Sequence, residues 1–144
     1  MAIYGRRSDK ADALARIPLF SNLSNKERME LARHLDEIPV KRGTVLIRQG
    51  EPGDAFYLIA DGKADVIRNG TKVAVLEAGD TVGEMALLDG EPRTATVAMI
   101  TEGTVLTMPR REFKAVLNDI PAMGQKMLVS LSLRLREANT RLAD

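Results

Sequence analysis

The sequence predicts an α+β fold in which an antiparallel β-roll is flanked by helices at both its N-terminal and its C-terminal end. Between Pro39 and Met108, nine glycines separate short runs rich in β-branched and aromatic residues. Short strands at spacings of about 8–12 residues with turn signals between them are typical of a sandwich or barrel. Apolar residues at helical spacing precede and follow this zone. The 144 residues suffice for a single domain, 1–144, with its own core.

The first zone, about 9–37, is predicted to be helical. Ala11 and Leu14 stand at helical spacing, and Pro18 ends that segment. Ser24-Asn25-Lys26-Glu27 has the pattern of a capping box, which begins a helix. Apolar residues as far as Leu35 continue this second helix.

The middle zone, about 38–108, is predicted to form the β-roll. Asp61-Gly62 and Asn69-Gly70 are signals for tight turns. Glu84 to Leu88 differ from their surroundings, because they are helix formers bracketed by glycines, and they predict a short helix inside the roll. The predicted strands are 44–47, 56–59, 64–67, 73–76, 94–98 and 104–107.

Two helices are predicted over about 109–142, with Pro109 at the first helical position and a longer helix from Met123. In the longer helix, apolar residues follow the spacing of a coiled-coil seam. The seam spans barely two heptads, so we expect it to pack on the β-roll of the same chain, with a homodimer through this helix as the alternative. The seam consists of Leu128, Leu131, Leu135, Ala138 and Leu142.

Composition excludes several classes of function. Lys and Arg number 21 against 20 Asp and Glu, a net charge of +1 that argues against direct nucleic-acid binding by this chain. There is no cysteine and one histidine, His34, so thiolate sites are excluded and a metal-dependent enzyme on a β-roll is disfavoured. No apolar run approaches the length of a membrane span. We therefore expect a cytoplasmic protein without metal, membrane span or catalytic activity.

The short helix has the ingredients of an anion site. Free N–H groups at a helix start favour phosphate, and Gly83 permits close approach of a ligand. Arg93 offers a planar fork for two phosphate oxygens, and Glu84 can accept hydrogen bonds from hydroxyls. A purely structural interpretation is equally open from the spacing alone: turns at Gly83 and Gly90, with Arg93 paired to Glu84 or Glu91.

The stretch Val82-Gly83-Glu84-Met85-Ala86-Leu87, followed after four residues by Pro92-Arg93-Thr94-Ala95-Thr96-Val97, closely resembles the phosphate-binding cassette of cyclic nucleotide-binding domains. This family includes catabolite activator proteins, protein kinase A regulatory subunits and cyclic-nucleotide-gated channels. The cassette here is taken as 83–95, and the resemblance extends from about 17 to 136. Val82 stands where the family often has an aromatic residue, a difference that affects packing and not ligand chemistry.

The resemblance implies a cyclic nucleotide ligand, cAMP or cGMP, with cAMP favoured. It implies that Arg93 pairs with the cyclic phosphate and that Glu84 accepts a hydrogen bond from the ribose 2′-hydroxyl. Backbone N–H groups at Gly83, Ala86 and Ala95 are expected to face the ribose or the phosphate.

For the base, the resemblance is less specific. It places Val66, Ala74 and Met85 beside the purine, although each also suits an ordinary core. Thr94 stands where a hydroxyl can contact the amino group of guanine, or it is simply a strand threonine. Arg134 on the last helix stands where an arginine can stack on the purine, or it is a solvated cation.

The function implied is that of a regulatory sensor. Ligand binding would draw the cassette helix toward the phosphate, and the C-terminal helices would move and pass the signal to an unidentified effector domain or protein. The alternative is a ligand-free interaction or dimerisation module with a vestigial pocket.

Overall fold

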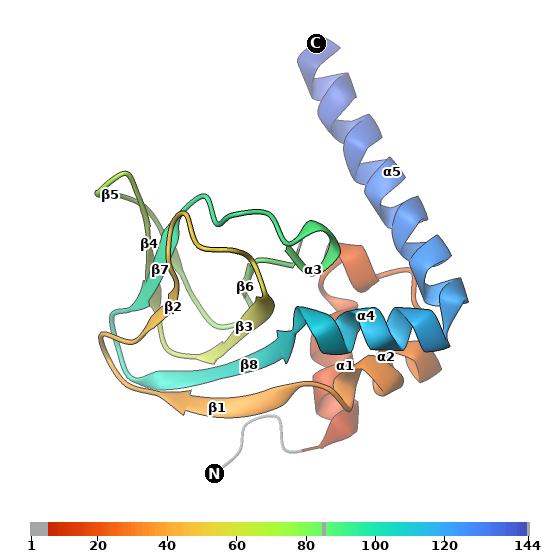
Figure 1. Cartoon of the computed structure of the whole chain (residues 1–144), viewed down its shortest axis with the longest axis horizontal. Helices are drawn as coiled ribbons and strands as arrows, with labels where there is room; N and C mark the ends of the chain where they lie inside the picture. Colours follow the sequence, from red (N-terminus) through yellow and green to blue (C-terminus); the bar gives the residue numbers. More distant parts are fainter. Residues whose placement is uncertain (1–5, 85, 144) are drawn as a thin grey trace.

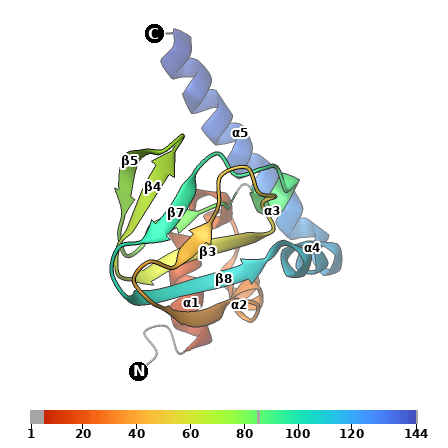
Figure 2. The ribbon, with the colours of Figure 1, turned by 60° about the vertical axis from the view of Figure 1, so that its left-hand side comes forward.

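The structure is a computed structural model that describes residues 6–84 and 86–143. In that part of the chain, eight strands form two antiparallel sheets between N-terminal and C-terminal helices. The first sheet has the order β1 (Asp36–Val40), β8 (Gly103–Pro109), β3 (Ala55–Asp61), β6 (Thr81–Val82). The second has the order β2 (Val45–Ile47), β7 (Thr96–Met99), β4 (Ala64–Arg68), β5 (Thr71–Leu76). The α+β fold with a β-roll is therefore confirmed, and Figure 2 shows β4, β5 and β7 together on one side of β3 and β8.

The N-terminal helices are α1 (Arg7–Ala15) and α2 (Asn25–Ala32), joined through the 3-10 turn η1 (Pro18–Phe20). The predicted capping box is present at α2. The backbone N–H of Glu27 donates to the Ser24 hydroxyl at 3.1 Å, and the Ser24 N–H donates to the Glu27 carboxylate at 2.8 Å.

The predicted turn between β4 and β5 also forms. Asn69 and Gly70 both adopt positive φ, at 52° and 80°. Positive φ at both central residues is what a two-residue hairpin of matching twist requires. The turn brings β4 and β5 into antiparallel register, with Val66 opposite Ala74.

Three phenylalanines join the helices to the first sheet. Phe20 of η1 lies edge-on to Phe56 of β3 at 6.3 Å between ring centroids, and 6.2 Å from Phe113 of α4 (Arg110–Asp119). Leu87 of the cassette helix α3 (Ala86–Asp89) is fully buried in the same cluster. One apolar cluster therefore connects the cassette to the helices that precede and follow the roll in the sequence, and these helices lie together at one end of the roll (Figure 1).

Several predicted boundaries were wrong. The N-terminal helical zone does not reach residue 37, because β1 already begins at Asp36 and pairs with β8. Pro39 is tolerated there since β1 lies at the edge of its sheet. The short strand β6 was not predicted. Pro109 is the N-cap of α4 and the end of β8 rather than a first helical residue, and α3 is shorter than the predicted 84–88.

Helix α5 (Pro121–Ala143) leaves the body of the molecule (Figure 1). Its start is anchored by Met123 and Met127, which are buried in the core. Leu131 of the seam packs against the core as expected. Leu128, Leu135 and Leu142 are 64%, 63% and 85% exposed, so the expected packing on the chain's own β-roll is not observed for these three seam residues. No helix within the described residues combines the length and apolar character needed to cross a bilayer.

Candidate functional site

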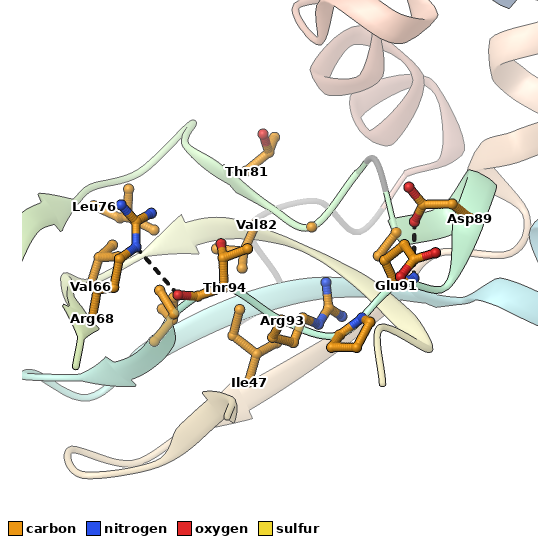
Figure 3. Close-up of a pocket in the computed structure, with 15 residues that line it drawn as sticks. Ile47, Val66, Arg68, Leu76, Thr81, Val82, Asp89, Glu91, Arg93 and Thr94 are labelled. Carbon is orange, nitrogen blue, oxygen red and sulfur yellow. Dashed lines mark hydrogen bonds between the residues drawn. The ribbon is translucent and has the colours of Figure 1, made fainter. Parts of the chain in front are cut away.

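A cavity of about 400 Å³ lies between the second sheet and the cassette. Its walls come from β2, β4, β5 and β7, from β6 and the turn after it, and from α3 with the segment that follows (Figure 3). Six residues singled out from the sequence meet in its lining. They are Val66, Gly83, Ala86, Arg93, Thr94 and Ala95.

Arg93 is the cation at the cassette end of this cavity, which Asp89 and Glu91 also line, and it is only 8% exposed. Its guanidinium donates to the carbonyl oxygen of Ala55 at the start of β3. Burial lowers the pKa of Arg93 from its usual value, and the nearby Asp54 and Tyr57 oppose that shift. Because an arginine pKa starts so high, the group stays charged.

The structural alternative, an ion pair between Arg93 and Glu84 or Glu91, is not observed. The ion pairs found among residues 6–84 and 86–143 do not involve Arg93. Asp54 lies near enough to act on the Arg93 pKa, but no carboxylate among the described residues is within ion-pair contact of the guanidinium. A buried charge without such a contact is costly, and an anionic ligand would remove part of that cost.

Gly83 is needed where it stands for two reasons. Its φ is +77°, in the left-handed region that side chains rarely adopt, and a Cβ built on it would overlap the Arg93 guanidinium. Gly53 has a related role on the other side of the cassette, since a Cβ there would lie 2.5 Å from the Ala86 Cβ. Two glycines thus allow the backbone to close around the arginine.

Glu84 lies next to the cavity but does not line it. Its carboxylate accepts a hydrogen bond from the Thr81 hydroxyl at 3.2 Å, and Thr81 itself is in the cavity wall. The N–H of Ala86 donates to the Gly83 carbonyl at 3.1 Å, so this predicted ligand donor is occupied within the protein. Met85 lies outside the described residues.

Two predicted base contacts are not brought to the cavity. Ala74 is paired with Val66 across β4 and β5, but its short side chain is exposed and does not reach the lining. Arg134 lies in the part of α5 that projects from the body, where it is exposed.

Arg68 lines the cavity but was not predicted from the sequence. It follows Val66 by two positions in β4, and alternate residues of a strand point to the same face. Ile47 and Leu76 were missed in the same way. Strand alternation was the signal that could have identified Arg68 once Val66 was placed.

Metal chemistry has no visible basis in the residues that the structure describes, where no group of three or more His, Asp or Glu could hold an ion. His34 lies with Nδ1 3.5 Å from a carboxylate oxygen of Glu112, which ties the end of α2 to α4.

Comparison with known families gives one match, to the family model described as "Cyclic nucleotide-binding domain", over residues 37–119. A cAMP-dependent protein kinase regulatory subunit from Aspergillus niger is 40% identical over 119 residues, covering 81% of this chain and 29% of that protein. A CRP-like cAMP-activated global transcriptional regulator from Mycobacterium tuberculosis is 30% identical over 138 residues, covering 92% of this chain and 62% of that protein. The chain thus spans less than two thirds of the length of either relative.

Among solved structures, the N-terminal domain of a transcriptional regulator from Streptomyces coelicolor A3(2) superposes with a TM-score of 0.82 at 32% identity. The match covers 91% of this chain and 95% of that one. The similarity therefore includes helices outside the residues that the family model matches.

Proposed function

Because the chain belongs to the cyclic nucleotide-binding domain family, we propose that its cavity binds a cyclic nucleotide monophosphate, cAMP in the first place and cGMP in the second. The observation that carries this proposal is the buried guanidinium of Arg93, which packs against Gly83 and forms no ion pair with a carboxylate of the described residues. A cyclic phosphate diester is a monoanion with no proton to lose near neutral pH, so its charge matches a permanently charged guanidinium.

The other cassette residues complete the ligand contacts in this proposal. Glu84, which already accepts a hydrogen bond from the Thr81 hydroxyl, accepts another from the ribose 2′-hydroxyl. Gly83 and Ala95 bring backbone N–H groups to the ribose and phosphate. On binding, Arg93 exchanges its hydrogen bond to the Ala55 carbonyl for the phosphate oxygens. Such charge-assisted bonds are stronger than neutral ones.

The preference for cAMP draws on the relatives, two of which are described by their response to cAMP. Nothing in the pocket by itself demands adenine. We propose that residues 1–144 form a sensor unit in the cytoplasm that acts on an effector domain or protein and has no catalytic activity of its own.

A route for the signal runs from α3 to α4. The Arg110 guanidinium donates to the carbonyl of Leu88, the residue before the end of α3, at 3.4 Å. The backbone N–H of Arg110 donates to the Asp54 carbonyl at 2.8 Å, beside the Ala55 carbonyl that Arg93 uses. A displacement of the cassette on binding therefore acts on the first turn of α4, and through α4 on α5. A difference of a few kcal/mol in ligand affinity between two positions of these helices is enough to switch their populations.

Calorimetric titration tests the proposal. We expect the unmodified protein to bind cAMP and, more weakly, cGMP. Arg93→Ala should weaken cAMP binding by about 2–5 kcal/mol, or roughly 30- to 3000-fold, because it removes one partner of a buried charge pair. Arg16→Ala, which removes the same charge from the exposed end of α1, is the matched control and should bind like the unmodified protein.

Two results would contradict the proposal. Unchanged affinity in Arg93→Ala would remove the phosphate assignment. No heat of binding with either nucleotide at high micromolar concentration would favour the ligand-free module with a vestigial pocket.

We also propose that α5 mediates contact with a second copy of the chain. The observation that favours this is the exposure of Leu128, Leu135 and Leu142, which stand seven residues apart on one face of a helix projecting from the body (Figure 1). Residues repeating at this interval form the seam of a two-stranded coiled coil.

A further inference from the structure

Arg68 is the second guanidinium in the cavity wall, and it lies at the opposite end from Arg93. Figure 3 shows Arg68 beside Val66 and Leu76, on the side of Thr94 away from Arg93. Val66 and Arg68 share the face of β4 that looks into the cavity. The cavity therefore has one cation next to the cassette turn and another next to the apolar residues of β4 and β5.

The Arg68 guanidinium is largely uncommitted. Its Nε donates to the backbone carbonyl of Thr94 at 3.3 Å, which is its single hydrogen bond to residues that the structure describes. The ion pairs among those residues do not include Arg68. Because the side chain is exposed at the cavity edge, its terminal N–H groups are available to a ligand.

Resting on the proposed function, we propose that Arg68 binds the edge of the purine and gives this pocket its affinity for 6-oxopurine cyclic nucleotides such as cGMP. With the phosphate on Arg93, the base extends toward the other end of the cavity, where Val66 and Leu76 offer an apolar wall. The hydrogen bond to the Thr94 carbonyl holds the Arg68 fork beside that wall.

The chemistry of the fork decides which purine benefits. A guanidinium has donors and no acceptor. Guanine presents two adjacent acceptors, O6 and N7, which match the fork in a bidentate arrangement. Adenine presents N7 beside an amino group, so one donor of Arg68 would face another donor. Arg68 therefore raises cGMP affinity relative to cAMP without forming any contact that cAMP requires.

The test separates Arg68 from Thr94 by the choice of ligands. Cyclic IMP carries the 6-oxo group of guanine but lacks its 2-amino group, which is the group that the Thr94 hydroxyl would contact. Titrations of cAMP, cGMP and cyclic IMP into the unmodified protein, Arg68→Ala and Thr94→Ala give a complete set. A bidentate base contact contributes about 1–3 kcal/mol of discrimination, so Arg68→Ala should lose roughly 5- to 150-fold in affinity for cGMP and cyclic IMP.

The same variant should change cAMP affinity by less than about twofold, since cAMP does not use the fork. Thr94→Ala should weaken cGMP and leave cyclic IMP unchanged. Arg68→Lys keeps the charge but removes the fork, so it should lose most of the 6-oxopurine affinity as Arg68→Ala does. Melting curves of both Arg68 variants show whether the β4–β5 hairpin still folds.

Equal losses for all three nucleotides in Arg68→Ala would overturn the inference, because they indicate stacking or a structural role. Unchanged affinities for all three would overturn it as well. If Arg93→Ala weakens binding while Arg68→Ala does nothing, this inference fails and the proposed function stands. An unmodified protein that binds none of the three nucleotides contradicts both.

Discussion

The cassette, residues 83–95, and helix α5 each hold side chains in an environment that such side chains ordinarily avoid. In the cassette, a charged guanidinium is buried, with 8% of Arg93 exposed. In α5, leucines are exposed, up to 85% at Leu142. Both arrangements cost free energy in the isolated chain: burial of a charge without an ion pair in the first case, and apolar surface left in water in the second. These costs are the reason for proposing a ligand at the cassette and a second copy of the chain at α5.

The two regions differ in how closely their own residues define what would bind to them. Around Arg93, the Ala55 carbonyl, Gly83 and the cavity wall surround a buried positive charge, and this arrangement supports the proposed phosphate ligand. Along α5, the exposed seam indicates only an apolar partner of helical shape. A concave site specifies its ligand by chemistry, whereas a convex helix face specifies little beyond an apolar surface.

The strongest test of the cassette half of this comparison is Gly83→Ala. A Cβ at this position overlaps the Arg93 guanidinium, so the arginine must leave the place from which it would contact the proposed ligand. We expect cAMP affinity to fall by about 30-fold or more, the lower bound for loss of the Arg93 contact. Titration calorimetry measures the change.

Gly79→Ala is the matched control, because Gly79 also has positive φ, at +94°, but a Cβ there meets no atom within 4 Å. It should lose stability through backbone strain and keep its affinity. If both variants bind cAMP equally well, the close packing of Gly83 on Arg93 is not what shapes the site.

The α5 half is tested by Leu135→Arg. Burial of one leucine in a helix seam contributes about 1.5–3 kcal/mol, and both helices of the dimer lose it, so the dimer dissociation constant should rise by at least about 10-fold. Sedimentation velocity over a concentration series measures this shift. Leu133→Arg makes the same chemical change two residues away at a position off the seam, which is 53% exposed, and should leave the constant unchanged. A protein that is monomeric at all concentrations would show that α5 is not a contact between copies.

Within the cassette, the role of Glu84 can be resolved by pairing a variant with a modified ligand. Glu84→Gln exchanges a charge-assisted hydrogen bond to the ribose for a neutral one, so cAMP affinity should fall about 5- to 10-fold. For 2′-deoxy-cAMP, which offers no hydroxyl, the same substitution should have almost no effect. Titration of both ligands into both proteins completes a double-mutant cycle, and additive effects would mean that Glu84 does not contact the ribose.

The cassette end of the cavity was predictable from one contiguous motif, whereas only Val66 was predicted at the end formed by β4 and β5. Gly83 and Arg93 are ten positions apart in the sequence, and they belong to one contiguous motif. The position of Arg93 nevertheless also depends on the segment before β3, since its backbone is hydrogen-bonded to Gly50 and Glu51 and its guanidinium donates to the Ala55 carbonyl. Arg68, Ile47 and Leu76 come from three different strands. Their convergence depends on the pairing of β2 and β4 with β7 and on a register shift between β4 and β5 that no local pattern announces.

The fold shows the same division between local and distant causes. The Asn69-Gly70 turn and the Ser24 capping box depend on neighbouring residues, and both formed as predicted. Strand β1 was missed because Asp36, Glu37 and Pro39 are poor strand formers, and the pairing with β8 outweighs that local preference. The direction of α5 could not be derived either, since the same 3-4 spacing of leucines suits packing on the β-roll or on another helix.

The smallest expected effect concerns the start of α5. This part of the helix must be held rigidly if a movement of α4 is to reach the seam residues of α5. The Lys126 ammonium of α5 lies 2.6 Å from the Glu27 carboxylate of α2. Burial acts to raise the pKa of Glu27, but hydrogen bonds from Lys126 and Ser24 together outweigh it and lower that pKa. A carboxyl with a lowered pKa in the folded state stabilises the fold above its unfolded pKa of about 4.3, and this contribution disappears as pH falls through the folded-state value.

Glu27→Gln keeps the capping box, which accepts glutamine as well as glutamate, but removes the ion pair. We expect a loss of about 0.5–1 kcal/mol in the free energy of unfolding at pH 7, measured by urea denaturation, with the difference from the unmodified protein shrinking below about pH 4. Glu30→Gln in the same helix breaks the exposed pair with Arg33, whose atoms are 3.2 Å apart, and should change stability by a smaller amount. If the two variants lose the same stability, the contact between α2 and α5 is no firmer than an ordinary surface ion pair, and α5 would then take up movement of α4 by shifting at its base rather than by swinging its exposed leucines.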